Sequence, residues 1–494
     1  MMPTEKVDVV YPSGIRLVLL MTSVFIGMFL VALDKLIIST AIPAITDEFH
    51  SANDIGWYGT AYLLTNCAFL LVFGKMYTFL DVKATFMAAA VLFEVGSAIC
   101  GAAPNSIAFI IGRAMAGLGA GGIQSGVLVI IVYAVPLQKR PMYQGLFGAV
   151  GRGASVCVFF LLHIPERSTT VNTLRQKLQQ LNIEGLLALL PGVICLCLAL
   201  QWGGFTLSWS NGKIIALLVV SFTLLIAFVL IQIWKPAQAT VPPHIFTQRS
   251  IAGGFWVSCC VGAHQTLFIY FLPIWFQAIK GDSAVESGIH LLPMVLSLVV
   301  ASILTGVLTT RVGYYMPFLI LGICIAAIGA GVLTCLHVNT SAGQWIGYQV
   351  LHGFGLGACF QAPNMAAQTV LPRDEVSIGA SLMLFAQTLF GAIFVSVGQN
   401  VLNSERAKRL AKFSNITPEQ IESVGVTGLF KMIPDKYQGA ALQAYNSSLS
   451  VCFRVALITA CLAILGGLVM EWRSVKRELG EEIGDDVEMR SVEA

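Results

Sequence analysis

The stretch SIAFIIGRAMAGLGAGGIQSGVLVIIVYA, residues 106–134, decides the fold because it places one arginine in a long, apolar, glycine-rich run. At a rise of 1.5 Å per residue, a helix of this length crosses the ~30 Å hydrocarbon layer of a membrane, and its glycines let neighbouring helices approach closely. A charge inside such a helix is costly and is by default a functional residue. Arg113 is therefore a candidate site residue. The alternative is an arginine near the helix end that reaches the membrane surface.

The composition excludes a soluble globular protein. Of the 494 residues, 56% are hydrophobic and only 11% are charged, whereas about a quarter of the residues of a soluble domain are charged. The sequence therefore predicts an all-α protein that crosses a membrane many times. A net charge of +3 is too small to indicate a nucleic-acid partner. The twelve cysteines lack the spacing of a disulfide framework or a metal site, so no metal site is predicted.

Apolar segments long enough to span a bilayer recur along the chain. Lysines and arginines gather in alternate short loops between the first segments, and they also follow the last segment. Because positively charged loops stay on the cytoplasmic side, both termini are predicted to be cytoplasmic. The candidate spans, about thirteen in number, are 16–46, 55–80, 84–103, 106–134, 141–163, 183–204, 212–234, 251–277, 287–310, 314–337, 345–370, 376–400 and 448–472.

The segment 141–163 disagrees with this topology. An odd number of crossings puts the two termini on opposite sides, yet Lys139 and Arg140 before this segment and Arg167 after it all indicate the cytoplasmic side. Its sequence resembles the start of one helix joined to the end of another. We therefore expect that a segment worth about one span is absent here.

Three asparagines lie in the Asn-X-Ser/Thr sequence that directs N-glycosylation. They are Asn339, Asn415 and Asn446, and all three fall on connections predicted to lie outside the cell. Since their positions agree with the side that the charged loops indicate, we predict that all three carry glycans.

An internal repeat divides the chain into two halves. A constant shift along the chain carries Arg113 onto Gln349, and the same or a similar shift superimposes glycines of the two halves. The order of the matches and their nearly constant shift predict two helical bundles of like topology. The matched glycines are Gly117 with Gly353, Gly119 with Gly355, Gly121 with Gly357 and, at a slightly smaller shift, Gly74 with Gly306.

The spans and the repeat together predict two pseudo-symmetric bundles and two extra linking helices. The predicted parts are an N-terminal bundle at 1–163 that is incomplete at 141–163, a cytoplasmic linker at 164–182, the linking helices at 183–234, a C-terminal bundle at 235–400, an extracellular loop at 401–447, the last helix of the C-terminal bundle at 448–472 and a cytoplasmic tail at 473–494.

Three stretches resemble motifs of the major facilitator superfamily, and in particular of its fungal fourteen-span drug:proton antiporters of family 2, the toxin and multidrug efflux type. LDKLIISTAIPAI at 33–45 is similar to the first-helix motif of that family. The glycine run at 112–122 is similar to the fourth-helix motif of the superfamily, and residues 74–83 are similar to its loop between helices two and three. The resemblance covers nearly the whole chain and implies the major facilitator fold.

Two departures from the family pattern bear on function. Thr78 and Asp81 stand where the superfamily usually carries an aspartate and a glycine. The glycine- and proline-containing antiporter motif of the fifth helix should follow Ser155, but it is missing together with the beginning of the sixth helix. The two lost half-helices amount to the span that the topology already requires.

The resemblance implies export of small amphipathic organic compounds, such as drugs, toxins and secondary metabolites, in exchange for protons by alternating access. A carboxylate in an apolar site can take and release a proton as the cavity changes side. Asp34 is the candidate carboxylate, and Arg113 is the group that acts on its charge. The alternative for Asp34 is a local pair with Lys35.

Further site residues are predicted for the cavity and for gating. A cavity for bulky apolar compounds needs aromatic walls and a few polar groups, and the candidates are Tyr62, Gln124, Tyr270, Gln361 and Gln387. The alternative for each is a contact that joins neighbouring helices. The residues predicted for the gating loops are Gly74, Lys83, Gly306 and Gly313.

The predicted partners are protons, the transported small molecule and membrane lipid. We expect no nucleic acid, no cofactor apart from the proton gradient, and a monomer. The expected location is the plasma membrane, with a vacuolar or vesicle membrane as the alternative. No spacing of nucleophile and base supports an enzyme. Two rival functions stay open: a transport-inactive copy of such an exporter, and a membrane sensor, against which the short acidic tail at 473–494 argues.

Overall fold

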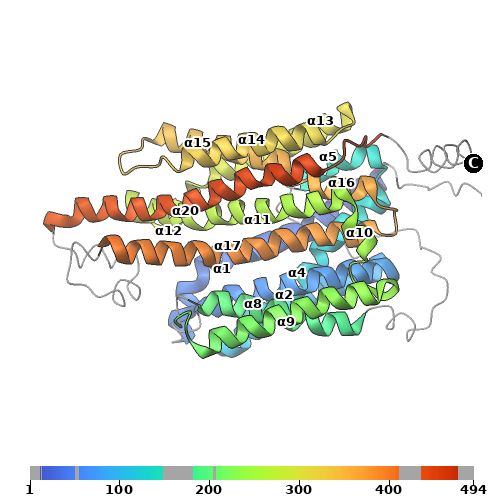
Figure 1. Ribbon diagram of the computed structural model, residues 1–494, viewed down its shortest axis with the longest axis horizontal. Coiled ribbons are helices and arrows are strands. Elements are labelled where there is room, and N and C mark those ends of the chain that lie inside the picture. Colours follow the sequence, from blue (N-terminus) through green and yellow to red (C-terminus); the bar gives the residue numbers. More distant parts are fainter. Residues whose placement is uncertain are drawn as a thin grey trace, which may run out of the picture.

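The N-terminal part of the chain forms one bundle of helices. The computed structural model describes residues 12, 14–49, 55–147, 182–203, 207–410 and 435–476, and long helices run side by side through it (Figure 1). The helices of the N-terminal bundle are α1 (Ile15–Phe49), α2 (Ile55–Phe79), α3 (Val82–Gly101), α4 (Ser106–Ala134) and the short α5 (Arg140–Phe147). Two linking helices follow, α8 (Ile183–Trp202) and α9 (Gly212–Trp234).

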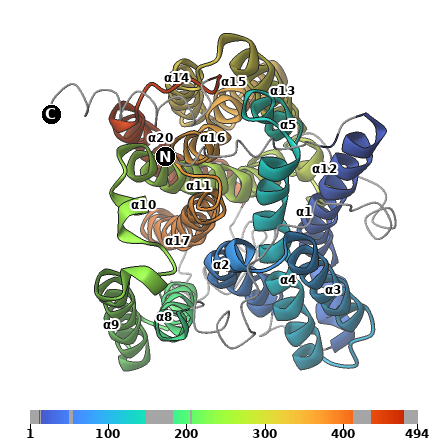
Figure 2. The same ribbon diagram turned by 90° about the vertical axis from the view of Figure 1, so that its right-hand side faces the viewer.

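The C-terminal bundle forms a second group. Seen along the helices, it lies on the other side of the molecule from α2, α3 and α4, with α8 and α9 at one flank, while the short α5 lies against it (Figure 2). It follows the short α10 (Pro243–Thr247) and comprises α11 (Arg249–Trp275), α12 (Ala284–Ile289), α13 (Leu292–Val312), α14 (Met316–Leu333), α15 (Ala342–Phe360), α16 (Ala362–Val370), α17 (Val376–Leu410) and α20 (Asp435–Val469).

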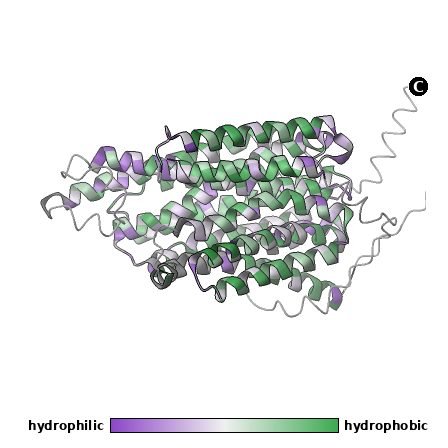
Figure 3. Ribbon diagram, turned by 90° about the horizontal axis from the view of Figure 1, so that it is seen from below, coloured by the Kyte–Doolittle hydropathy of each residue, from purple (hydrophilic) through white to green (hydrophobic). Residues whose placement is uncertain are grey.

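Apolar residues cover most of the length of these helices, and hydrophilic residues gather toward their ends (Figure 3). Within the described residues, nine helices are long and apolar enough to cross a membrane. Two shorter apolar stretches lie in the first part of α1 and in α8. This confirms the predicted all-α polytopic fold. The predicted segment 345–370 is divided at Gln361 into α15 and α16, just before Pro363, which has no main-chain donor to continue a helix.

The glycines of α4 explain how the N-terminal bundle packs. A Cβ atom on Gly117 would collide with the main chain of Tyr62 in α2, and one on Gly119 would collide with the main chain of Phe93 in α3. Since only glycine permits this approach on both faces, α4 lies between α2 and α3 with its backbone close to each.

The C-terminal bundle repeats this arrangement and confirms the predicted two-fold design. A Cβ atom on Gly353 of α15 would collide with the carbonyl oxygen of Met294 in α13, and one on Gly355 would collide with the main chain of Ala326 in α14. Helix α15 therefore lies between α13 and α14 as α4 lies between α2 and α3.

A shared apolar core joins the two bundles to the linking helices. Leu71 of α2, Leu189 of α8 and Phe385 of α17 belong to one cluster of buried side chains. Because α8 contacts both α2 and α17, the linking pair is packed against the seam between the bundles.

Two predicted boundaries need correction or lie outside the described residues. The expected extracellular loop at 401–447 is helical at both ends, since α17 runs to Leu410 and α20 begins at Asp435. Both helices continue beyond the apolar layer because their outer turns are polar and still favour helix. Of the incomplete segment 141–163, the structure describes only α5, so the expected missing span lies outside the described residues.

Candidate functional site

The structure brings Arg113 and Asp34 together in an ion pair between α4 and α1. Nη1 of Arg113 lies 2.6 Å from Oδ2 of Asp34. Nε of Arg113 donates to the carbonyl oxygen of Tyr58 in α2 at 3.0 Å, and its guanidinium carbon lies 4.4 Å from the ring centre of Tyr62. One arginine therefore joins three helices of the N-terminal bundle.

The burial of Arg113 decides between the two alternatives for that residue. The Arg113 side chain is only 2% exposed, so it does not reach the membrane surface and the alternative of an interfacial arginine is wrong. Asp34 is 17% exposed and pairs with Arg113; the side chain of Lys35 lies outside the described residues. A buried guanidinium stays charged, whereas a partly exposed carboxylate can exchange protons with water.

The five predicted cavity residues do not gather around one cavity. Tyr62 and Gln124 are buried inside the N-terminal bundle. The side chain of Tyr270 is 49% exposed on α11, and Gln387 is half-buried on α17, where its main chain contacts Gly262. Sequence periodicity could not separate these environments because all five residues lie in segments that the sequence predicts as apolar spans. In this conformation the five residues lie apart, and a cavity lined by all of them stays a prediction.

Gln361 does line a cavity, which lies where α5 meets α13, α15 and α16. This cavity has a volume of about 20 Å³, enough for one water molecule. Both amide atoms of Gln361 and the hydroxyl of Ser302 are buried there without a protein partner among the described residues. Sequence reasoning missed Ser302, because a lone serine in an apolar helix carries no signal.

The predicted gating residues lie mostly in helices and not in loops. Gly74 is inside α2, and Gly306 is inside α13. Lys83 is exposed in the first turn of α3. Gly313 ends α13 with a φ of 91°, a left-handed conformation that favours glycine. Asp81, which departs from the family pattern, caps α3 by accepting a hydrogen bond from Ala84 N at 2.7 Å.

Gly74 and Gly306 mark the places where the two bundles touch. A Cβ atom on Gly74 would collide with Ser381 of α17, and one on Gly306 would collide with the carbonyl oxygen of Pro141 in α5. One turn after Gly74, the hydroxyls of Thr78 and Ser377 lie 2.7 Å apart. These contacts hold the bundles together at the end where α2 stops and α17 starts, which the charged loops predict to be cytoplasmic.

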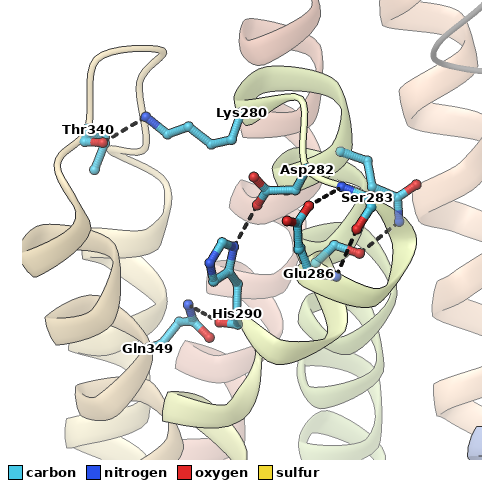
Figure 4. A network of polar contacts seen from close by, with 9 residues as sticks. Lys280, Asp282, Ser283, Glu286, His290, Thr340 and Gln349 are labelled. Atoms are coloured by element: carbon cyan, nitrogen blue, oxygen red, sulfur yellow. Dashed lines mark hydrogen bonds and ion pairs between the residues drawn. The ribbon is translucent and has the colours of Figure 1, made fainter.

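Gln349, the repeat counterpart of Arg113, makes a comparable bond in the C-terminal bundle. Its Nε2 donates to the carbonyl oxygen of His290 at 3.0 Å (Figure 4). Nδ1 of His290 lies 2.6 Å from Oδ2 of Asp282, and the close-up shows this group together with the neighbouring Glu286. The repeat pointed to Gln349, but no pattern in the sequence pointed to its partners.

Two histidines lie buried in the same bundle. The rings of His264 in α11 and His352 in α15 meet edge to face, with centroids 5.3 Å apart and an interplanar angle of 77°. Nδ1 of His352 lies 3.1 Å from the carbonyl oxygen of Ala326, which can only accept, so this nitrogen donates. No sequence motif signals this pair, because the two residues lie far apart in the chain and on different helices.

The predicted glycosylation sites have three different outcomes. Asn339 is exposed between α14 and α15, so a glycan there stays a prediction. Asn415 lies outside the described residues. The prediction for Asn446 is wrong, because its side chain is buried, its Oδ1 accepts from Trp275 Nε1 at 2.7 Å and its Nδ2 donates to Leu336 O at 2.9 Å.

Comparison with known proteins identifies similar transporters. The model of the Major Facilitator Superfamily matches residues 24–395. The MFS-type efflux pump MFS1 of Arthroderma benhamiae is 45% identical over 497 positions, which cover 94% of this chain and 93% of the pump. The efflux pump aflT of Aspergillus parasiticus is 42% identical over 94% of this chain and 97% of its own length.

A third relative shows a difference in length inside the aligned region. An MFS-type transporter of Claviceps purpurea is 44% identical over 502 positions, which cover 94% of this chain and 87% of the relative. Since 94% of 494 residues is about 464, about 38 aligned positions have no counterpart in this chain. That number is close to one membrane span with its connections.

Solved structures support the same fold at low sequence identity. The human organic anion transporter MFSD10 (TETRAN) matches with a TM-score of 0.54 at 11% identity, covering 91% of this chain and 100% of the transporter. The transporter FucP in its outward conformation matches with a TM-score of 0.54 at 13% identity, covering 91% and 98%. At sequence identities this low, the structural match shows the fold of the chain and nothing further.

Proposed function

The chain belongs to the major facilitator superfamily, and from this premise we propose that it exports small amphipathic organic compounds in exchange for protons by alternating access. Its family makes it a multi-pass membrane transporter of small molecules and not an enzyme. The names of similar fungal proteins, efflux pumps MFS1 and aflT, support export as the direction. The proposed compounds are drugs, toxins and secondary metabolites.

The observation that carries proton exchange is the pair of Arg113 and Asp34. A buried guanidinium in a membrane helix is costly, and that of Arg113, two turns into α4, lies 2.6 Å from the carboxylate of Asp34. Asp34 keeps 17% of its side chain exposed, so water can deliver and remove a proton while Arg113 stays buried. An arginine paired with a carboxylate is what a contact between α1 and α4 needs if a proton is to control it.

Protonation of Asp34 would change the forces between these helices. The neutral carboxyl no longer attracts the guanidinium, while Arg113 keeps its bond to Tyr58 and its contact with the ring of Tyr62. Helix α1 can then move relative to α4 at a lower electrostatic cost, and loss of the proton restores the pair. In the proposed cycle, this change biases the two bundles toward opening on one side or the other.

The contact between the bundles supports alternating access. Pro141 packs on Gly306 and Thr78 bonds Ser377 at the predicted cytoplasmic end, so this conformation is closed at that end. We assign it to the stage of the cycle in which a compound leaves on the opposite side of the membrane. Opening toward the cytoplasm requires these contacts to separate.

The remaining features belong to the same proposal, and the positions of the charged loops support the side assigned to the termini. The transporter acts as a monomer in the plasma membrane, or in a vacuolar or vesicle membrane, with both termini cytoplasmic. It needs no cofactor apart from the proton gradient, and membrane lipid surrounds its apolar helices.

One observation favours a second candidate, a transport-inactive copy of such an exporter. About 38 aligned positions of the Claviceps relative have no counterpart in this chain. If they correspond to the fifth and sixth helices, where the antiporter motif is missing after Ser155, the N-terminal bundle lacks a wall of its cavity. The contact between Pro141 and Gly306 supports the working exporter, because the start of the fifth helix still packs on the C-terminal bundle.

The proposal is tested by pH-driven transport in lipid vesicles. Purified wild-type protein and the Asp34→Asn variant are reconstituted, a pH gradient is imposed, and movement of a panel of amphipathic fluorescent dyes that includes rhodamine 6G is recorded. Wild type is expected to move at least one dye with the gradient. Asp34→Asn is expected to lose gradient-driven movement, since an amide cannot exchange a proton.

Glu94→Gln provides the matched control. Glu94 is another acid in the N-terminal bundle, but its side chain is exposed on α3, so its loss should leave dye movement unchanged. Transport by Asp34→Asn at the wild-type rate would refute proton coupling through Asp34. A wild-type protein that moves none of the dyes, in either direction and at any gradient, would favour the inactive copy.

A further inference from the structure

Residues 235–248, which connect the linking helix α9 to the first helix of the C-terminal bundle, form a segment that we call the strap. It contains the short helix α10 and runs along the end of the molecule where the bundles touch. Ala239, Thr240 and Ile245 of the strap are buried, although a connection between membrane helices is usually exposed. Side chains from three other parts of the structure bind it.

The first attachment folds the strap back onto its own linking helix. Oε1 of Gln232, near the end of α9, accepts hydrogen bonds from the main-chain nitrogens of Thr240 at 2.6 Å and Val241 at 3.3 Å. Gln232 is itself buried, so these bonds are shielded from water. The middle of the strap is therefore fixed relative to α9.

The second attachment comes from the N-terminal bundle. Nζ of Lys75 in α2 donates a hydrogen bond to the carbonyl oxygen of Ala239, and it lies 5.0 Å from the ring centre of Phe79. Only 4% of the Lys75 side chain is exposed. A buried ammonium needs good partners, so its bond to the strap is a strong constraint.

The third attachment comes from the C-terminal bundle. Nε2 of His244 in the strap lies 2.8 Å from Oε1 of Glu375, which immediately precedes α17. At the end of the strap, Gln248 caps α11 by accepting from Ser250 N at 2.6 Å and Ile251 N at 3.0 Å.

These attachments surround the contact between the bundles. Lys75 follows Gly74, which packs against Ser381, and Glu375 stands just before Ser377, which bonds Thr78. The strap thus binds both helices that form the contact, α2 through Lys75 and α17 through Glu375. A motion that separates α2 from α17 must stretch or break one of these attachments.

We propose that the strap holds the two bundles together at this end, and that Lys75 must release Ala239 before α2 and α17 can separate. The two linking helices then have a task of their own, since they anchor the strap that stabilises the closed contact. The proposal concerns the conformational equilibrium of the protein, and it holds whether or not the chain proves to export a compound.

Disulfide cross-linking across the contact tests this proposal. Thr78→Cys and Ser377→Cys are introduced together, with a protease site inserted in the segment 164–181, so that only a disulfide keeps the cleaved fragments joined on a non-reducing gel. The protein is kept in its membrane, and each single-cysteine variant shows the background from the native cysteines. With the wild-type strap, cross-linking is expected to be fast because the two hydroxyl oxygens lie 2.7 Å apart.

Lys75→Met removes the donor but keeps the apolar length of the side chain. It is expected to slow cross-linking about tenfold, which is the scale of losing one hydrogen bond from a charged group. Gln232→Leu releases the strap from α9 without touching α2 or α17, and it is expected to slow cross-linking in the same direction by a smaller factor. This variant decides the test if Lys75→Met does not fold.

Lys235→Gln is the matched control. Lys235 is the first residue of the strap, and its Nζ lies 2.6 Å from Oε2 of Glu184 in the other linking helix. Because this ion pair is largely exposed and does not reach α2 or α17, its loss should leave the cross-linking rate unchanged. Unchanged cross-linking in folded Lys75→Met and Gln232→Leu would overturn the proposal. Equal slowing by Lys235→Gln would overturn it as well, because the effect would then come from lost charge and not from the attachment to α2.

Discussion

The two bundles make a similar hydrogen bond at equivalent positions, but the donor is a charged arginine in one bundle and a neutral glutamine in the other. Nε of Arg113 donates to Tyr58 O at 3.0 Å, and Nε2 of Gln349 donates to His290 O at 3.0 Å. The repeat aligns the two donors, Arg113 and Gln349. The slightly smaller shift that aligns Gly74 with Gly306 also aligns the two acceptors, Tyr58 and His290. In each bundle this bond joins the fourth helix to the start of the second, at Tyr58 within α2 and at His290 just before α13, so it is part of the shared scaffold.

The difference lies at the first helix of each bundle. A similar shift aligns Pro43 with Pro273 and carries Asp34 onto His264. Asp34 pairs with Arg113, whereas His264 packs its ring against the ring of another histidine, His352. The comparison teaches that both bundles share the scaffold bond, while at the position of Asp34 the N-terminal bundle carries an ion pair and the C-terminal bundle carries a pair of histidines.

The largest effect is expected when Arg113 is replaced by glutamine, the residue type at the equivalent position 349 of the C-terminal bundle. Arg113→Gln can keep the bond to Tyr58 O, as Gln349 keeps its bond to His290 O, but it leaves Asp34 without a cation. We expect gradient-driven transport to be lost and the free energy of unfolding to fall by about 3 kcal/mol, because a semi-buried carboxylate loses its partner. Dye movement in vesicles and chemical unfolding in detergent measure the two effects.

The reverse comparison provides the control for that prediction. Gln349→Glu places a carboxylate at the equivalent position of the C-terminal bundle, away from Arg113, and is expected to destabilise the protein without restoring transport to Arg113→Gln. Transport by Arg113→Gln alone at the wild-type rate would show that the ion pair is structural.

Intermediate effects are expected at the glycines that repeat between the bundles. Gly117→Ala and Gly353→Ala should each lower the free energy of unfolding by about 1–3 kcal/mol, since each new methyl meets main chain that cannot move aside. The controls are Gly59→Ala in α2 and Gly347→Ala in α15. Among the described residues, no atom of a neighbouring element lies within 4 Å of a Cβ built at either glycine, so both changes should leave stability unchanged or raise it. Unequal losses at Gly117 and Gly353 would weaken the equivalence of the two bundles.

The smallest effect is expected for the scaffold bond of the C-terminal bundle. Gln349→Leu removes one hydrogen bond at nearly constant volume and should lower the free energy of unfolding by about 1 kcal/mol. Transport should change little, because no charge is lost. A loss of transport as large as that of Arg113→Gln would mean that the uncharged bundle also takes part in coupling.

Much of the fold could be predicted because its signals are periodic and repeated. The apolar spans, the glycines of α4 and α15, and the shift between the halves all report helix packing directly in the sequence. The pairing of Arg113 with Asp34 could be anticipated for a similar reason, since two ionisable groups in apolar helices stabilise each other best when they meet. Proton coupling through them stays a prediction.

The rest depends on three-dimensional neighbours that periodicity does not encode. A sequon shows that Asn446 has the right neighbours in the chain, but its burial between α11 and the end of α14 is set by tertiary packing. Similarly, a motif assigns Gly74 and Gly306 to loops, whereas the structure shows that the helices continue and meet the opposite bundle there. Exposed Tyr270 and buried Tyr62 look alike in sequence.

The length of α17 and α20 has a practical consequence. Each has 35 residues and so is about 52 Å long, which exceeds the ~30 Å of a bilayer interior, and Glu405 and Arg409 form an ion pair on the last turns of α17. Their ends project past the other helices (Figure 1). An antibody fragment raised against this projection would bind only the C-terminal bundle, and its orientation in electron micrographs would test whether that bundle tilts relative to the rest of the molecule.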